Sequence, residues 1–190
     1  MAQSVLVIAD SGTGKSTAIR NLNPDETFII NIANKPLPFK GWKKNYTLIS
    51  KENPKGNLAS ASSAIGIMKA IKHVDEKMPA IKTLVVDDWQ YMSSFEYFDR
   101  ANEKGYDKFT QIAANLAQVA KMPKDLRDDL TVIFLTHSED STDLNGNRKV
   151  KAKTIGKMID NTLTLEGLFS IVLFGKVNKN DDGELEYGFE

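Results

Sequence analysis

Five short apolar runs recur along the chain, and longer segments separate them. They are rich in valine, isoleucine, leucine and phenylalanine and lie at 4–8, 27–32, 82–87, 130–136 and 169–174. Continuous apolar runs of this length are typical of strands in a parallel sheet that is covered on both faces. The pattern therefore predicts a mostly parallel sheet built on these strands.

Three segments between the runs repeat apolar residues with the 3.6-residue period of an α-helix. They lie near 60–74, 89–102 and 109–120. The apolar positions are Ala61, Ala64, Ile65, Met68 and Ile71 in the first, Met92, Phe95 and Phe98 in the second, and Phe109, Ile112, Ala113, Leu116, Val119 and Ala120 in the third. Strands that alternate with helices predict an α/β fold with a doubly wound, mostly parallel sheet.

The chain has 190 residues, which suits one α/β domain spanning 1–190. Residues 33–58, rich in Lys, Pro, Asn and Gly, are interpreted as an insertion within it. Residues 138–154 are interpreted as a basic β-hairpin around an Asn-Gly-Asn turn at 145–147. A second C-terminal hairpin is expected at the Asn-Asp-Asp-Gly turn at 180–183.

Composition narrows the functional classes. Lysine plus arginine and aspartate plus glutamate both number 25, so the net charge is zero and any contact to nucleic acid has to come from a local basic patch. The chain lacks cysteine, which excludes disulfides and thiolate metal sites. No apolar run approaches about 20 residues, and the N-terminus enters a strand directly. We therefore expect a soluble cytoplasmic protein that does not contact a membrane.

Residues 9–17, ADSGTGKST, connect the first predicted strand to a predicted helix. The two glycines allow backbone N–H groups to turn toward a phosphate. In such a loop Lys15 would reach the β- and γ-phosphates of ATP, and Ser16 would coordinate Mg²⁺. The predicted nucleotide-binding residues are Ser11, Gly12, Thr13, Gly14, Lys15, Ser16 and Thr17. Ala9 replaces the first glycine of the P-loop pattern, which is compatible with the motif if its φ is negative.

The third predicted strand ends in two adjacent carboxylates, Asp87 and Asp88. A buried strand that ends in an acid at the P-loop edge is typical of a Walker B element, in which Asp87 would hold Mg²⁺ through its water shell. Adjacent carboxylates repel each other unless a cation offsets them, which favours a metal-associated site. Asp88 is the candidate for orienting and polarising the attacking water. The alternative is a strand that ends at solvent and takes Asp for its turn.

The strand at 130–136 ends at the same edge in polar residues. Thr136 or His137 would contact the γ-phosphate or the attacking water and act as a sensor of hydrolysis. A purely structural contact of His137 is an equally weighted alternative. Glu139 competes with Asp88 for the water-activating role.

Together these residues resemble a known group of proteins. The features that carry the resemblance are the loop GTGKST, the strand ends Asp-Asp-Trp-Gln at 87–90 and Thr-His-Ser-Glu at 136–139, the segment 153–160 and the unusual stretch 34–42. They resemble phage-encoded ATPases with a RecA-like core, which are grouped with single-strand-annealing and recombination proteins. The resemblance implies a RecA-like P-loop ATPase that uses ATP and Mg²⁺, binds single-stranded DNA and assembles into filaments or rings of identical subunits. A single-strand-binding protein is a further expected partner.

The chain departs from RecA proteins in one functional respect. No glutamate follows the second predicted strand, where RecA proteins carry their water-activating residue. For this reason the water-activating role is assigned to Asp88.

The returning arm of the predicted hairpin 138–154 is rich in lysine. Alternation along a strand places Lys149, Lys151 and Lys153 on one face. There they would follow DNA phosphates or, with Lys157, reach the γ-phosphate of a neighbouring subunit. A solvated hairpin whose edge lysines discourage aggregation is the alternative. A second mixture of lysines and aromatic residues suits either single-strand binding or an anchor for the insertion; its members are Lys40, Trp42, Lys43, Lys44 and Tyr46.

Three rival functions share the P-loop. A GTPase is suggested by Asn-Lys-Asn-Asp at 178–181, but the Asp-x-x-Gly partner motif is missing, since 87–90 read Asp-Asp-Trp-Gln. A small-molecule kinase needs a lid with several arginines, and Arg148 is the only arginine after the sensor strand. A AAA+ or helicase-loader motor that acts on a protein partner usually adds a helical C-terminal lid, which the residues after 167 do not predict. That motor is the main alternative to an ATPase acting on single-stranded DNA.

Overall fold

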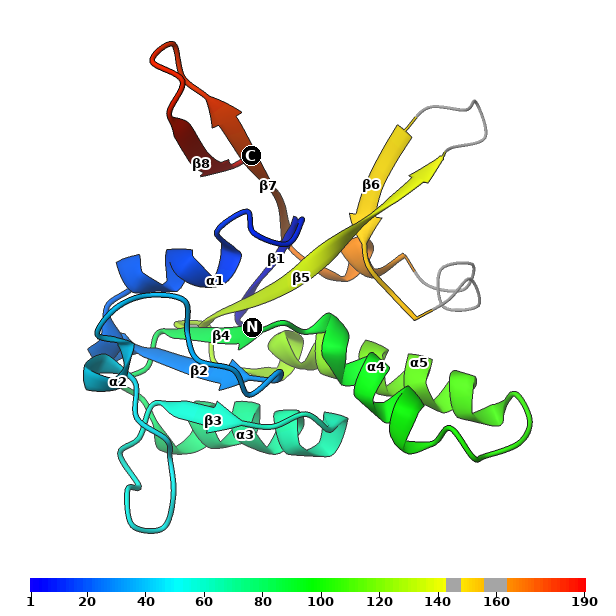
Figure 1. Ribbon diagram of the computed structural model, residues 1–190. Helices are drawn as coiled ribbons and strands as arrows, with labels where there is room; N and C mark the ends of the chain where they lie inside the picture. Colours follow the sequence, from blue (N-terminus) through cyan, green and yellow to red (C-terminus); the bar gives the residue numbers. More distant parts are fainter. Residues whose placement is uncertain (143–147, 156–163) are drawn as a thin grey trace.

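The computed structural model describes residues 1–142, 148–155 and 164–190, and a mostly parallel eight-stranded sheet forms its centre (Figure 1). The strands are, in sheet order, β3 (Leu58–Ser60), β2 (Thr27–Asn31), β4 (Thr83–Asp87), β5 (Thr131–Thr142), β1 (Gln3–Ala9), β7 (Ile171–Lys179) and β8 (Leu185–Phe189), with β6 (Arg148–Ala152) paired to β5 outside this order. The strands from β3 to β7 pair in parallel, whereas β6 and β8 return antiparallel. The predicted α/β fold with a mostly parallel sheet is confirmed.

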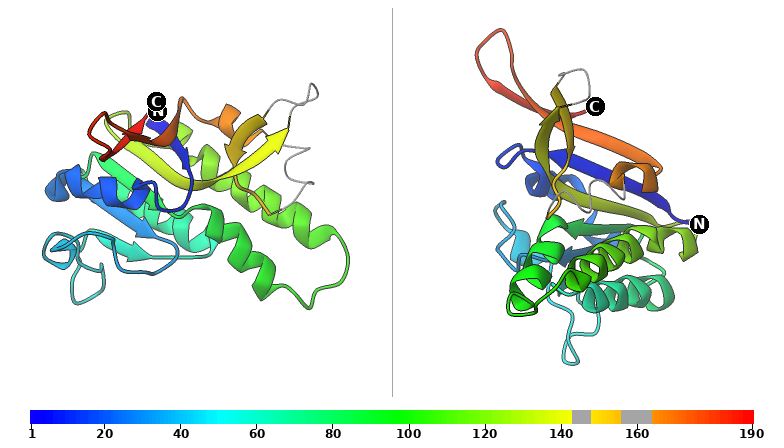
Figure 2. Two further views of the ribbon diagram at one scale, coloured as in Figure 1. Left: turned by 45° about the horizontal axis from the view of Figure 1, so that its top comes forward. Right: turned by 90° about the vertical axis from the view of Figure 1, so that its right-hand side faces the viewer.

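Helices cover the two faces of the sheet unequally (Figure 2). One face carries α3 (Ala64–Lys77), α4 (Gln90–Asp99) and α5 (Asp107–Lys121), and the other carries the short α1 (Lys15–Ala18) and α2 (Trp42–Asn45). Because side chains alternate along a strand, β1 sends Leu6 and Ile8 into the larger core and Val5 and Val7 into the smaller one.

The helix after the P-loop, whose first turns are predicted over residues 16–22, is shorter than that range. α1 has four residues and continues only as the 3-10 turn Ile19–Asn21 before the chain becomes extended at Leu22. Asn23 is also extended, as expected for a residue that precedes a proline, here Pro24. Stabilisation of a phosphate must therefore come mainly from N–H groups of the loop, because so short a helix has little dipole of its own.

The buried face of α3 is turned relative to the predicted one. Ile67, Ile71 and Val74 are fully buried, whereas Ile65 is 64% exposed. The hydroxyl of Ser63 accepts the N–H of Gly66 and caps the helix, so α3 begins at Ala64 and the expected start near residue 60 is wrong.

Residues 33–58 form the crossover between two paired strands. β3 pairs in parallel with β2, with Leu58 opposite Ile29. Leu37 and Tyr46 are buried in the smaller core, which favours the anchoring interpretation of the aromatic residues in this segment. β3 was not predicted because three residues, LAS, make no recognisable apolar run.

The paired strands of both predicted C-terminal hairpins are present and project from the P-loop edge of the sheet (Figure 1). The turn predicted at 145–147 lies outside the described residues. The Asn180 side chain accepts the N–H of Glu184 at 2.8 Å, and Gly183 has a φ of 81° in the turn between β7 and β8. The Asn-Lys-Asn-Asp sequence at 178–181 is therefore the end of β7 and its turn, as the hairpin interpretation predicts.

Gly175 allows β7 to approach β1 closely at the base of the P-loop. A Cβ at this position would lie 2.5 Å from the Cβ of Ala9, well inside van der Waals contact. Asn34 and Asp88 are the non-glycine residues with positive φ in the described ranges, so Ala9 satisfies the condition for replacing the P-loop glycine. The methyl group of Ala9 uses the space that Gly175 leaves open.

We expect Gly175→Ala to destabilise the fold by roughly 1 to 3 kcal/mol, because two methyl groups cannot share this space. Adding Ala9→Gly in the same chain should recover most of the loss. Denaturant unfolding of wild type, both single variants and the double variant measures this coupling. Effects that simply add in the double variant would show that the two positions do not compete for the same space.

Candidate nucleotide-binding and hydrolysis site

Four neighbouring parallel strands bring the candidate site residues to one edge of the sheet. The carboxyl ends of β2, β4 and β1 lead to Lys35, to Asp87 and Asp88, and to the P-loop, and His137 lies within β5 where that strand passes this edge. Carboxyl ends of parallel strands meet at the same edge, where ligands of open α/β sheets bind. Because β5 lies between β1 and β4, His137 comes to lie between the P-loop and Asp88.

The P-loop has the backbone that its two glycines predict. Gly12 and Gly14 have φ values of 82° and 88°, in the region that favours glycine. Lys15 is 7% exposed and donates hydrogen bonds to the carbonyl oxygens of Ala9 and Asp10, at 2.6 and 2.7 Å. Burial lowers the pKa of Lys15. A bound phosphate would take over from these carbonyl oxygens as the partner of the ammonium group.

The two predicted magnesium ligands face each other. The hydroxyl of Ser16 donates a 2.7 Å hydrogen bond to Oδ1 of Asp87, whose side chain is almost completely buried. Hydroxyl and carboxylate oxygens are ligands that Mg²⁺ prefers, so this pair fits the ion. Magnesium held here would neutralise charge that develops on the β- and γ-phosphate oxygens. No group of three or more histidine, aspartate or glutamate side chains that could hold a metal ion occurs in the described ranges.

Burial, and after it the negative charge of Asp88, raises the pKa of Asp87 to about 6. The folded protein therefore holds this proton more tightly than the unfolded chain does. The resulting stabilisation is complete below the usual value of 3.8 and is lost as the pH rises through about 6.

In magnesium-free buffer the free energy of unfolding should fall by roughly 2 to 3 kcal/mol between about pH 4 and pH 7 through this group. Asp87→Asn should lack that component. Denaturant unfolding of both proteins over this range measures the difference. Identical pH dependence in the two would mean that Asp87 is ionised throughout.

Asp88 lies at the centre of a charged cluster. Its carboxylate is 3% exposed, with Oδ2 2.5 Å from Nζ of Lys35 and Oδ1 3.5 Å from Nε2 of His137. Burial by itself would raise the pKa of Asp88, but hydrogen bonds from His137 and Lys35 outweigh it and lower the pKa to about 2. The residue is thus an ionised carboxylate, which suits it to orient a water molecule more than to keep that water's proton.

His137 is the better placed of the two sensor candidates on β5. Its backbone N–H donates to Oε1 of Gln90 at 3.2 Å, and its ring meets the edge of Tyr91 at 6.1 Å between centroids. Thr136 is 1% exposed in the same strand. The side chain that reaches the Asp88 carboxylate is therefore that of His137.

Lys35 is the site residue that the sequence did not reveal. It follows β2, next to Asn34, whose φ of 51° is one that asparagine tolerates better than most residues. The side-chain amide of Asn31 fixes the turn by donating to the carbonyl oxygen of Lys35 at 2.7 Å. The available signal was positional: Lys35 stands just beyond a buried strand that neighbours the Walker B strand.

The remaining candidates lie on the β5–β6 hairpin. Glu139 pairs with Lys151 at 3.8 Å and is 43% exposed. Lys149 and Lys153 are exposed, and the N–H of Lys153 donates a 2.8 Å hydrogen bond to the carbonyl oxygen of His137. The hairpin is therefore bonded directly to the backbone of His137, the candidate sensor.

Lys157, the fourth lysine predicted for this arm, lies outside the described residues.

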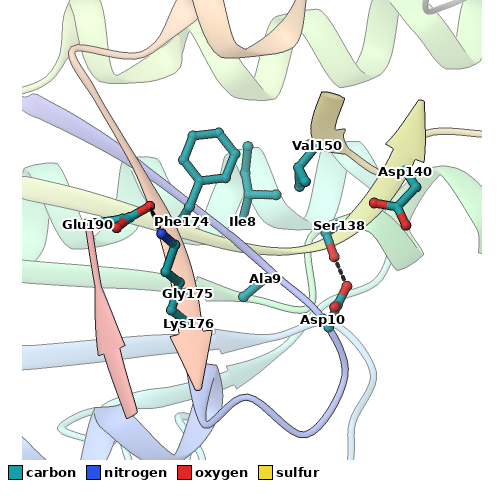
Figure 3. A pocket seen from close by; sticks show the side chains of 10 residues that line it. All are labelled: Ile8, Ala9, Asp10, Ser138, Asp140, Val150, Phe174, Gly175, Lys176 and Glu190. Atoms are coloured by element: carbon teal, nitrogen blue, oxygen red, sulfur yellow. Dashed lines mark hydrogen bonds and ion pairs between the residues drawn. The ribbon is translucent and has the colours of Figure 1, made fainter. Parts of the chain in front are cut away.

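A cleft of about 420 Å³ opens between the two hairpins above the end of β1 (Figure 3). Asp10 of the P-loop and Ser138 of β5 point toward each other across it and are hydrogen-bonded. On the other side, Lys176 and Glu190 form an ion pair. The Ser138–Asp10 bond links the start of the basic hairpin to the P-loop.

Comparison with known proteins places the chain in a family. A family model described as an AAA domain matches residues 1–188. No curated protein matches the chain. Within the described part of the chain, no helix has the length and apolar character needed to cross a membrane. The match covers nearly the whole chain and agrees with the P-loop and Walker B geometry, so the protein belongs to the AAA domain family of P-loop ATPases.

Proposed function

We propose that this protein is a magnesium-dependent ATPase of phage origin that acts on single-stranded DNA during recombination or annealing. It works as an oligomer in the cytoplasm of the host cell. ATP is favoured over GTP because 178–181 form a strand end and a hairpin turn, and the Asp-x-x-Gly motif is missing.

The continuity of β5 carries this proposal. The strand runs from Thr131 in the middle of the sheet to Thr142 at the end of the hairpin, and His137 lies between them. Up to His137 it pairs with β1, and from Ser138 onward it pairs with β6. A ligand that binds the hairpin can therefore affect the γ-phosphate side of the site, at His137, through this one strand.

The charge of the hairpin favours an anionic polymer as its partner. Alternation places Lys149 and Lys151 on one face of β6, while Ala152 on the opposite face is buried. Lys149 is exposed on this projecting β-ribbon, whereas Lys151 pairs with Glu139. Exposed lysines here provide the local basic patch that a chain without net charge needs for phosphate contacts. Lys153 extends the patch to the mouth of the site.

An oligomer is favoured because the arginines whose contacts are described form ion pairs away from Asp88 and its partners Lys35 and His137. Arg100 pairs with Glu103, and Arg127 pairs with Asp129. Lys35 is the additional cation that a subunit itself brings to Asp88. We propose that a neighbouring subunit supplies the other basic group, from Lys153 or from Lys157.

Salt dependence of binding to single-stranded DNA tests the proposal. Each phosphate contact contributes about 0.7 to the slope of log affinity against log salt for single strands. Combined Lys149→Ala and Lys153→Ala should therefore lower the slope by about 1.4. Combined Lys51→Ala and Lys55→Ala removes two exposed lysines beside β3 and serves as the matched control, with an unchanged slope expected.

The same samples should form oligomers with ATP and DNA when analysed by light scattering. A protein that stays monomeric, and whose hairpin variant binds DNA like wild type, would contradict the proposal. It would favour a motor that acts on a protein partner instead.

A further inference from the structure

A second cavity, of about 380 Å³, lies beside the P-loop and α1. One wall consists of Gly12, Gly14 and Thr17, and the other consists of Tyr187 and Phe189 from β8. Residues 87, 88 and 137, which mark the γ-phosphate side, are not among its lining residues. The cavity therefore borders the P-loop but does not include Asp87, Asp88 or His137.

The direction of a bound triphosphate follows from the loop. Lys15 reaches the β- and γ-phosphates, and the backbone N–H groups surround the α- and β-phosphates. The γ end of the nucleotide points toward Lys15 and Asp88, so its nucleoside end has to leave the loop elsewhere. The cavity that Gly14 and Thr17 line offers this exit.

The outer wall has the chemistry that a nucleobase needs. Tyr187 and Phe189 alternate along β8 and so point to the same face, with exposed fractions of 57% and 44%. The Tyr187 ring lies against Gly14, because its Cδ1 is 3.4 Å from where a Cβ on Gly14 would be. Aromatic faces stack well on the flat face of a base. Arg20 lines the same cavity and offers a planar guanidinium.

The close approach of β7 to β1 holds this wall in place. Phe189 pairs with Gly175 across the hairpin, and its ring lies 3.5 Å from where a Cβ on Gly175 would be. Gly175 in turn meets Ala9 at the start of the P-loop. The aromatic wall and the phosphate loop are thus joined through one short contact.

We propose that Tyr187 and Phe189 form the subsite for the base of the nucleoside triphosphate. The inference rests on the proposed function in one respect, namely that the triphosphate occupies the P-loop. The hairpin β7–β8 then forms part of the nucleotide site, and its occupancy by the base covers two exposed aromatic side chains.

A comparison of magnesium ATP with magnesium tripolyphosphate, which has no base, tests the subsite by calorimetric titration. Tyr187→Ala should weaken ATP binding by about 5- to 150-fold, the range for loss of one base-stacking contact. Tripolyphosphate binding should be unchanged. Tyr187→Phe keeps the ring and should bind ATP like wild type. Leu185→Ala is the matched control, since Leu185 shares this face of β8 but is not among the cavity's lining residues.

The outcomes separate the subsite from the phosphate site. Lys15→Ala should weaken the binding of both ATP and tripolyphosphate. If this variant bound both ligands as tightly as wild type does, the P-loop assignment itself would be overturned. An equal loss of both ligands in Tyr187→Ala, or no loss of either, would overturn the base subsite. If the alanine variant does not fold, Tyr187→Trp serves instead. Its fluorescence should respond to ATP and not to tripolyphosphate, and an equal response to both would overturn the inference.

Discussion

Lys15→Ala should reduce ATP hydrolysis by about 10²- to 10³-fold or more, the scale expected when a main donor to a developing charge is removed. The ammonium group is buried in the loop and already bonded to Ala9 and Asp10, so it sits ready for an incoming phosphate. Removing it takes away the main positive side chain at the β- and γ-phosphates and should also weaken ATP binding. Steady-state turnover and nucleotide titration measure the two effects.

Lys15→Arg is an informative companion. It keeps the positive charge, but the larger guanidinium does not fit a side chain position that is 7% exposed inside the loop. We expect it to hydrolyse ATP poorly as well. Circular dichroism should show that both variants remain folded. If a folded Lys15→Ala protein hydrolysed ATP at the wild-type rate, the assignment of residues 9–17 as a P-loop would be contradicted.

Asp88→Asn should retain magnesium ATP but slow turnover by about 10²-fold or more, as expected when the group that orients the attacking water is lost. The substitution conserves shape, and asparagine accepts the φ of 58° at this position. It leaves Lys35 and His137 without their carboxylate partner, but Lys35 is 52% exposed and can turn toward solvent. The loss should therefore appear in turnover rather than in folding.

Asp87→Asn separates the role of the metal from the role of the water. Because Asp87 faces Ser16 at 2.7 Å, its loss should weaken the dependence on Mg²⁺ concentration itself. Turnover measured against Mg²⁺ for both variants makes the comparison. Equal and mild effects from the two substitutions would reject this division of roles, and Glu139→Gln would then be the variant to measure.

The sequence predicted those parts of the fold that depend mainly on hydrophobicity. The apolar runs of β1, β2, β4 and β5 are largely buried, and that of β7 is partly buried, so these five strands could be recognised from hydrophobicity. The three residues of β3 are too few for that, and they join the sheet because β2 offers a free edge. The helix face was harder to predict, since Ile65 continues the apolar pattern of α3 but is exposed, and Ala61 packs against the core from outside the helix.

Sequence motifs predicted the part of the candidate site that belongs to the P-loop and Walker B patterns. Ser16 and Asp87 lie 71 residues apart and meet as the P-loop and Walker B patterns require. Lys35 could not be found in this way, because its role depends on the left-handed turn at Asn34 and on the neighbouring position of β2 and β4. The same holds for Tyr187, which reaches the P-loop only because β7 and β8 fold back over it.

The central claim is that the basic hairpin couples single-stranded DNA to ATP hydrolysis through β5. Its most direct test is the ATP turnover of wild type and of the Lys149→Ala, Lys153→Ala variant, each with and without single-stranded DNA at low salt. The account predicts that DNA accelerates the wild type and that the variant loses this acceleration. A wild-type rate that does not respond to DNA, or a variant stimulated as strongly as wild type, would contradict it.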